Sequence, residues 1–460
     1  MGSKKNAWLK FDDTKKEEIF SFCEGYKKYI SDCKTERESI KEAISLAESK
    51  GYRDLKNVIS AGKSLKAGDK VYYNNMDKSL ALFLIGSESI ESGMRIIGSH
   101  VDSPRLDLKP NPLYEDSELS LMETHYYGGV KKYQWVTIPL ALHGVVVKKD
   151  GTKIDVVVGE EETDPVVMVS DLLVHLASEQ QQKKATEVIA GEDLNILVGS
   201  MPLEGEEKEA VKANILKLLK EKYDFEEEDF MSAEIEIVPA GKARDLGLDR
   251  SMVAGYGHDD RICAYTSLLA LLETESVKKT SVVLLVDKEE VGSIGATGMQ
   301  SRFFENAVAE LMDRVGEYSE LKLRRALANS KMLSSDVTAA FDPNYAGAYE
   351  KKNSAFFGKG LAFAKYTGAR GKSGCNDANA EFVAWLRNVM DENDVAYQMA
   401  ELGKVDQGGG GTIAYILAEY GMEVIDCGVA LQNMHAPWEV ASKVDIFETM
   451  RGYKAFLMAE

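Results

Sequence analysis

Two adjacent carboxylates, Glu289 and Glu290, follow an apolar run in the segment "SVVLLVDKEEVGS", residues 281–293. The short continuous run at 282–286 predicts a buried strand. Because desolvating a charge is costly, two carboxylates at the end of a core strand need a compensating partner. One carboxylate on such a turn could bind a metal ion, while its neighbour acts as general base toward a metal-activated water.

Other side chains that can bind metals stand at the ends of predicted strands or at a helix start. In open α/β sheets, sites lie beyond the carboxyl ends of the strands. The residues at such positions are His100 and Asp102 after the run 94–99, Asp336 after 331–335, His435 after 423–433, and His258, Asp259 and Asp260 before the helical pattern 261–272.

Each of these residues alone has an ordinary explanation, because an Asp before a helix usually caps it and paired glutamates usually face solvent. Together they indicate more, since carboxylates clustered at one sheet edge repel one another unless a cation is present. Imidazole combined with carboxylate is a ligand set typical of zinc. Two histidines with three or more carboxylates suit two metals that share a bridging carboxylate.

The elements that must position these residues predict an α/β fold with a mainly parallel central sheet flanked by helices. Helical and strand patterns alternate up to about residue 110 and again after about residue 246. Such alternation is typical of βα units around a parallel sheet. We therefore predict an α/β catalytic domain from residues 1–110 and 246–460. Residues 111–245 are rich in strand patterns, such as 135–149, and predict an inserted β-rich domain.

Composition excludes several classes of protein. The 460 residues carry a net charge of −19, which disfavours nucleic-acid binding. No apolar run approaches the ~18 residues needed to span a bilayer, so we expect no membrane association. The five cysteines are scattered without a CxxC pair, and the N-terminus lacks a signal-peptide pattern. Both features predict reduced thiols and a cytoplasmic protein.

The segments "GSHVDSPRLDLKP", "HDDRICAYTSLLALL", "DKEEVGS", "SSDVTAAFDPNY" and "NMHAPWE" occur in this order along the chain. They resemble the aspartyl aminopeptidase family of dinuclear zinc aminopeptidases, and the resemblance runs from about residue 90 to 458. The related glutamyl and deblocking aminopeptidases share a His-x-Asp, an Asp-Asp-Arg and a Glu-Glu pair. The "DSP" close after His100 and the "DPNY" close after Asp336 favour the aspartyl group.

The resemblance implies an enzyme that removes N-terminal residues from peptides with a free N-terminus, with acidic residues, Asp or Glu, as the candidate preference. It implies two zinc ions per subunit, for which Co²⁺ or Mn²⁺ could substitute. The metal ligands that it implies are His100, Asp259, Glu290, Asp336 and His435.

Three further roles follow from the same resemblance. Asp259 would bridge the two ions, Asp102 would orient His100, and Glu289 would be the general base. The spacing of Leu268 and Leu271 in the following helix favours Asp259 over Asp260 as the bridging ligand, although both remain candidates.

Weaker patterns indicate substrate contacts. Gly409 and Gly410 belong to four consecutive glycines before a predicted helix. This pattern indicates either a tight turn or backbone N–H groups that contact substrate at the start of the helix. Lys372, in a glycine-rich loop, would read an acidic first side chain by the resemblance. His175 would reach a neighbouring subunit's active site by the resemblance, or would be an ordinary helix histidine.

The resemblance also implies a homo-oligomer, in which the insertion is a dimerisation domain and six dimers form a tetrahedral dodecamer. A carboxypeptidase or N-deacylase on the same dinuclear core is an alternative, and it would need a guanidinium such as Arg261, Arg302 or Arg370 for the substrate carboxylate. A glutamyl or deblocking aminopeptidase is a second alternative. A non-catalytic metal-binding protein is a third, which Glu289 disfavours because it has no evident structural need.

Overall fold

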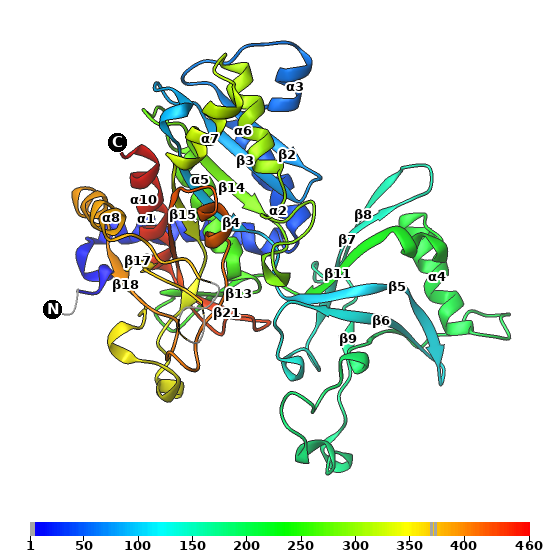
Figure 1. The fold of residues 1–460 in the computed structure, drawn as a ribbon. Helices are drawn as coiled ribbons and strands as arrows, with labels where there is room; N and C mark the ends of the chain where they lie inside the picture. The colour runs from blue at the N-terminus through cyan, green and yellow to red at the C-terminus, as the bar shows by residue number, and fades with distance from the viewer. Residues whose placement is uncertain (1–4, 369–370, 372–374) are drawn as a thin grey trace. The chain divides into compact units, whose positions relative to one another are not determined.

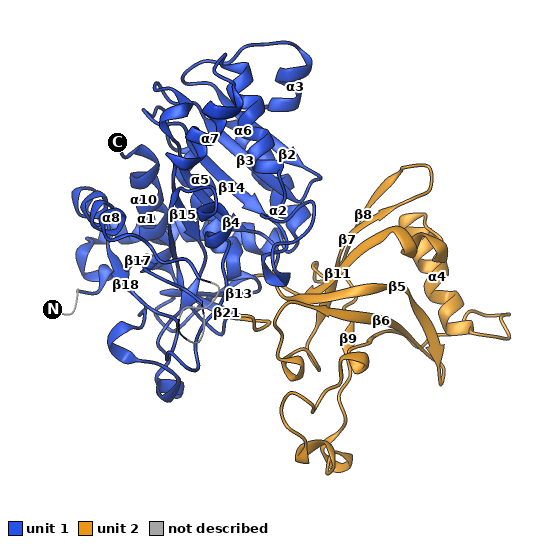
Figure 2. Cartoon of the chain, in the orientation of Figure 1, with its two compact units in different colours: residues 1–102, 243–434, 439–460 blue, residues 103–242, 435–438 orange. Residues whose placement is uncertain are grey.

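The computed structural model describes residues 5–368, 371 and 375–460, and the chain forms two compact units (Figures 1 and 2). Unit 1 comprises residues 1–102, 243–434 and 439–460, and unit 2 comprises residues 103–242 and 435–438. The predicted catalytic and inserted domains, with boundaries near 110 and 246, stay a prediction, because compactness alone does not show which segment folds independently.

A nine-stranded sheet forms the centre of unit 1. In spatial order its strands are β1 (Arg53–Asp54), β2 (Lys70–Asn75), β3 (Ser79–Leu84), β14 (Ser281–Val286), β4 (Arg95–His100), β15 (Lys331–Ser335), β19 (Glu423–Gly428), β17 (Leu361–Ala364) and β18 (Tyr397–Met399). The four central strands β14, β4, β15 and β19 run parallel to one another. The neighbours β3 and β17 run antiparallel to them. The predicted mainly parallel α/β fold is confirmed.

Helices cover both faces of this sheet (Figure 1). One face packs on α1 (Asp13–Asp32), α2 (Glu36–Ser49), α5 (His258–Leu272), α8 (Ala380–Glu392) and α10 (Lys443–Met458). The other packs on α3 (Leu55–Ser60), α6 (Phe303–Arg314), α7 (Glu320–Ala328) and α9 (Ala414–Ala418). Successive strand residues point to opposite faces, so Val283 joins the first core and Leu284 the second. This double burial explains why β14 is a continuous apolar run.

Helix α2 begins at a reciprocal capping box. The Thr35 side chain accepts a hydrogen bond from the Glu38 N–H at 3.2 Å, and the Glu38 carboxylate accepts one from the Thr35 N–H at 3.1 Å. These two hydrogen bonds satisfy donors that the first helical turn leaves open.

A smaller five-stranded sheet lies beside the start of α5. Its order is β12 (Arg244–Leu246), β13 (Met252–Gly255), β21 (Glu439–Ser442), β20 (Ala430–Gln432) and β16 (Thr338–Ala339). Strand β13 leads into α5 and β21 leads into α10, so this sheet sets where both helices begin.

Unit 2 is built on a seven-stranded antiparallel sheet. Its order is β8 (Lys153–Val158), β7 (Leu140–Val147), β11 (Ala233–Pro239), β5 (Arg105–Asp116), β6 (Leu119–Tyr127), β10 (Ile196–Gly199) and β9 (Met168–Val169), and it is accompanied by α4 (Ala210–Tyr223). The strand expected at 135–149 begins only at Leu140, immediately after Pro139, which has no N–H to give to a sheet. Across both units, no described helix has the length and apolar character to cross a membrane.

Candidate metal centre

The carboxyl ends of three neighbouring strands bring the predicted residues of unit 1 together. His100 ends β4, Asp336 follows β15, and Glu289 and Glu290 follow β14. Because β4 lies between β14 and β15 and runs parallel to both, these ends share one sheet edge.

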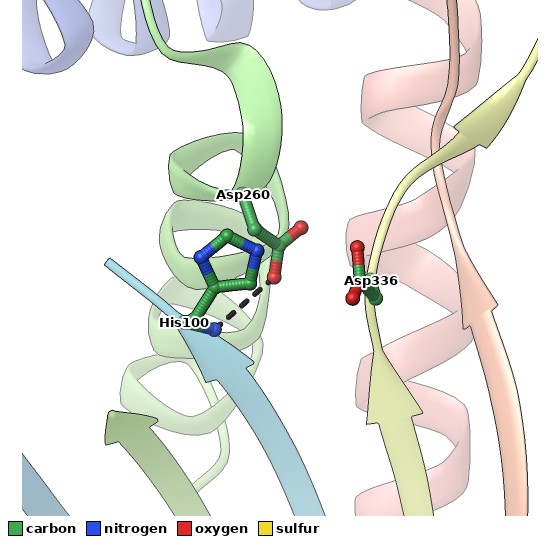
Figure 3. A group of neighbouring side chains, drawn as sticks. All are labelled: His100, Asp260 and Asp336. Carbon is green, nitrogen blue, oxygen red and sulfur yellow. Dashed lines mark hydrogen bonds between the residues drawn. The ribbon is translucent and has the colours of Figure 1, made fainter. Parts of the chain in front are cut away.

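Helix α5 adds its first residues to this edge. Figure 3 shows Asp260 at the start of α5 beside His100, with Asp336 at the end of β15 nearby. His100, Asp260 and Asp336 offer ligand atoms that lie within 4.8 Å of one another, and so do His100, Glu289 and Glu290.

His100 is held on both sides of its buried imidazole ring. Its Nδ1 lies 2.9 Å from the carbonyl oxygen and 3.3 Å from the carboxylate of Asp102. Its Nε2 lies 3.3 Å from Asp259 and 3.8 Å from Glu289. Burial opposes a charge on the ring, but hydrogen bonding to Asp102 and Asp259 outweighs it and raises the pKa of His100 well above its ordinary value. In the absence of metal, a proton on this ring therefore partly neutralises the cluster.

Asp102 connects the end of β4 to the loop that carries the glutamate pair. Its Oδ1 accepts a hydrogen bond from the Glu289 N–H at 3.1 Å, and its Oδ2 accepts one from the Glu290 N–H at 3.2 Å. The single 3₁₀ turn at Glu289–Val291 ends at Gly292, whose φ of 97° favours glycine. Asp102 thus orients His100 and the backbone of both glutamates at once.

Asp259 and Asp260 leave the helical path at the start of α5, and their shared peptide bond is cis. The Asp259 N–H donates to the buried carboxylate of Glu439 at 3.0 Å. The Oδ2 atom of Asp260 accepts from the His100 N–H at 3.2 Å (Figure 3). Its Oδ1 is buried and has no hydrogen-bond partner within the described ranges. The two adjacent carboxylates therefore contact different parts of His100.

Two acids in the cluster favour the protonated state. Burial, together with the nearby charge of Asp336, raises the pKa of Asp260 well above its ordinary value. Burial and the charge of Glu289 do the same for Asp336. A cation bound among these carboxylates would offset this mutual repulsion. Imidazole and carboxylate donors are those that zinc accepts, so the residues present fit a zinc site.

His435 belongs to unit 2, where its Nδ1 lies 2.9 Å from the carbonyl oxygen of Gly129. The cluster of His100, Asp259, Asp260, Asp336 and the two glutamates therefore belongs to unit 1 alone. His175, also in unit 2, lies on an exposed 3₁₀ turn, Val174–Leu176, rather than in an α-helix.

Gly409 and Gly410 precede α9, and the Gly410 carbonyl accepts from the Gly368 N–H at 3.0 Å. Lys372 and Arg370 lie outside the described residues.

Two of the guanidinium candidates have local partners. Arg261 is buried, its Nε donates to the Gly257 carbonyl at 3.2 Å, and its guanidinium lies 5.0 Å from the Tyr256 ring centroid. Arg302 pairs with Glu305 at 2.5 Å.

Two residues that contact the start of α5 were not predicted from the sequence as site residues. Glu439 is the last residue of the segment "NMHAPWE" that contains His435, and that proximity was a usable signal. Tyr26 gave none, because it looks like any apolar position of an amphipathic helix. Its hydroxyl lies 2.5 Å from Nδ1 of His258, and both side chains are fully buried. Burial lowers the pKa of His258 to about 3, so the imidazole is neutral, and its Nδ1 shares a hydrogen bond with the Tyr26 hydroxyl.

A mainly parallel sheet with buried His and Asp side chains and two half-buried glutamates at its carboxyl edge defines a class, the α/β metallohydrolases. The profile of the family described as Aminopeptidase I zinc metalloprotease (M18) matches residues 29–457. The chain is 66% identical over 454 residues to a probable M18 family aminopeptidase 1 of Clostridium acetobutylicum, covering 98% of both sequences. The chain belongs to the M18 family and is a zinc metallo-aminopeptidase, which confirms the resemblance seen in its motifs.

Solved structures agree with this assignment. The aminopeptidase I of C. acetobutylicum has a TM-score of 0.93 at 65% identity, and an M18 aminopeptidase of Thermotoga maritima has 0.95 at 45%, each with 99% of both chains covered. A structure described as the mApe1 dodecamer of Saccharomyces cerevisiae has 0.76 at 20% identity, covering 95% of this chain and 96% of that one. The last likeness concerns the fold alone.

Proposed function

We propose that the cluster at the carboxyl edge of the unit 1 sheet holds two zinc ions and removes the first residue of peptides with a free N-terminus. One observation carries this proposal. Asp260 and Asp336 are buried beside His100, and burial, followed by the charge of nearby carboxylates, raises the pKa of both. Such a cluster is stabilised by bound cations.

The ligands in this proposal are His100, Asp259, Glu290, Asp336 and His435. In this proposal Asp259 would be the ligand shared by the two ions, because its carboxylate lies 3.3 Å from Nε2 of His100, whereas Asp260 accepts a hydrogen bond from the His100 backbone. Cobalt or manganese could bind to the same donor atoms.

Zinc, when bound, polarises the scissile carbonyl and lowers the pKa of a water molecule at the site. Glu289 accepts a proton from that water at its carboxylate and returns it to the nitrogen of the leaving amine. Its position supports this role, because its carboxylate lies 3.8 Å from His100 and its backbone is held by Asp102. Asp102 keeps the His100 ring oriented so that Nε2 faces the cluster.

The proposed substrate is a peptide whose first residue is acidic, Asp or Glu, and Lys372 recognises this side chain. Gly409 and Gly410 supply backbone contacts to substrate, and His175 reaches the site of a neighbouring subunit. A Lys372→Ala variant should lose cleavage of Asp-substrates much more than of Leu-substrates. Equal change on both, or no change, would remove Lys372 from the proposal.

The assembly in this proposal is a homo-oligomer in which dimers form a tetrahedral dodecamer. The S. cerevisiae structure is described as a dodecamer. The exposed apolar side chains Leu172, Leu173, Val174 and Leu176 support it, because such a run in unit 2 is suited to burial against another copy. Light scattering tests this assembly, and a mass near that of one subunit, 50.8 kDa, would contradict it.

We place the enzyme in the cytoplasm, in agreement with five cysteines that form no disulfide. Cell fractionation tests this location.

The experiment that tests the reaction compares hydrolysis of Asp-, Glu-, Leu- and Lys-anilides by zinc- and cobalt-loaded enzyme with the Glu289→Gln variant. We expect the variant to keep its metal and to lose activity by roughly 10²–10⁴-fold, the usual contribution of a general base. The matched variant Glu290→Gln should instead lose metal affinity. Near-normal turnover by metal-loaded Glu289→Gln would reject the base. Cleavage restricted to N-blocked substrates would favour an N-deacylase.

A further inference from the structure

The backbone that presents Asp259 and Asp260 is not held by a regular helix. Gly257 has a φ of 73°, and both aspartates have φ and ψ values outside the helical region. Helical hydrogen bonds therefore cannot fix these residues, and buried side chains do so instead, one from α5 itself and others from elements packed against it. Glu439 of β21 accepts from the Asp259 N–H, and Arg261 donates to the Gly257 carbonyl.

The third of these supports comes from the N-terminal helix α1. Tyr26 is fully buried, and its hydroxyl lies 2.5 Å from Nδ1 of His258, the residue directly before Asp259. The two rings also contact each other, with centroids 5.5 Å apart. The family profile begins at residue 29, three positions beyond Tyr26.

We propose that Tyr26 is a positioning residue for the metal centre, and that its hydroxyl fixes the backbone of Asp259 and Asp260 through the ring of His258. This inference rests on the proposed metal site. Ligands must be held close to their productive geometry, and residues behind the ligands do this. Tyr26 and Glu439 hold consecutive residues, His258 and Asp259, so loss of either contact frees one end of the ligand segment.

Helix α1 offers a matched control. Tyr29 lies on the same helix, is also buried, and its hydroxyl makes no hydrogen bond within the described part of the chain. The rings of Tyr26 and Tyr29 both pack on Tyr265, at centroid distances of 5.5 and 5.0 Å. Tyr26→Phe and Tyr29→Phe thus remove the same atom from similar surroundings, but only the first breaks the contact with His258.

The test measures zinc affinity of the metal-free, full-length protein by competition with a chromophoric chelator, together with the visible spectrum of the cobalt form. Tyr26→Phe should weaken zinc binding about tenfold, the lower end for residues that support ligands, and should alter the cobalt spectrum. Tyr29→Phe should do neither. If both variants bind zinc like the wild type while Tyr26→Phe only unfolds more easily, Tyr26 is merely structural and the inference fails.

A second pair of variants keeps the inference testable if Tyr26→Phe does not fold. His258→Asn retains a side-chain acceptor near the position of Nδ1, whereas His258→Leu removes it. We expect zinc affinity to stay close to wild type in the first and to fall in the second, and equal affinities would overturn the inference. Failure of the proposed function looks different, because the wild-type protein itself would then bind no zinc.

Discussion

Asp102 and Glu289 are joined by a hydrogen bond of 3.1 Å from the backbone N–H of Glu289 to Oδ1 of Asp102. The other carboxylate oxygen of Asp102 accepts from the next backbone N–H in the same turn. A carboxylate at the end of β4 thereby fixes the residues that follow β14. Both oxygens act as acceptors, which is the arrangement of an ionised carboxylate.

An Asp102→Asn substitution should lower kcat by roughly 10- to 100-fold and weaken zinc binding, because the amide keeps one acceptor oxygen and turns its NH₂ toward a backbone N–H. Steady-state kinetics and chelator competition measure the two effects. The exposed Asp313→Asn change is the control and should leave both unchanged. Wild-type kinetics in metal-loaded Asp102→Asn would show that the Glu289 turn holds its place without this carboxylate.

Asp259 and Asp260 can be separated by the same isosteric change at each position. Asp260→Asn keeps an oxygen to accept the His100 N–H and should retain most zinc affinity. Asp259→Asn replaces the proposed bridging carboxylate and should lose at least one zinc ion per subunit. Metal content after dialysis distinguishes them. The reverse result would make Asp260 the bridging ligand.

Removal of metal should destabilise the protein more at high pH than at low pH. The raised pKa values of Asp260 and Asp336 mean that the folded, metal-free protein keeps protons that the unfolded chain releases. Its stability therefore falls as pH rises above the unfolded pKa of about 4. Zinc replaces those protons, and at 100 times its Kd it adds about 2.7 kcal/mol.

Thermal unfolding with zinc and with chelator, at pH 5 and pH 8, measures this effect. The gap between the two melting temperatures should widen at pH 8. A gap that is the same at both values would show that the cluster does not exchange protons for metal.

Much of this centre could be predicted from sequence because its residues follow strands with strong patterns. The apolar runs ending at His100, Val286 and Ser335 predict three strands, and parallel strands bring their ends to one edge. The prediction of a strand at 135–149 was wrong at its start, because hydrophobicity alone does not show that Pro139 lacks the backbone N–H that a sheet requires. Tyr26 could not be predicted, because its hydroxyl acquires a role only through a contact with His258, far along the chain. The Asp259–Asp260 backbone depends on such contacts too.

Asp445, near the start of α10, should make stability depend on pH independently of the metal. It is fully buried and accepts hydrogen bonds from the Gly358 and Gly360 N–H groups at 2.7 and 2.6 Å. Burial outweighs these bonds and raises the pKa of Asp445 to about 7. Since the unfolded value is about 4, the folded protein alone holds this proton between pH 4 and 7, and stability falls as pH rises through that window. Above pH 7 the contribution is flat.

An Asp445→Asn variant should therefore lose a slope of up to about 1.4 kcal/mol per pH unit between pH 5 and 7 relative to wild type. Urea unfolding midpoints at pH 5, 6, 7 and 8 measure it, and the metal cluster contributes equally to both proteins. The exposed Asp391→Asn on α8 is the control and should parallel the wild type. If Asp445→Asn also runs parallel to the wild type across this range, the two glycine N–H groups hold Asp445 ionised in the folded protein.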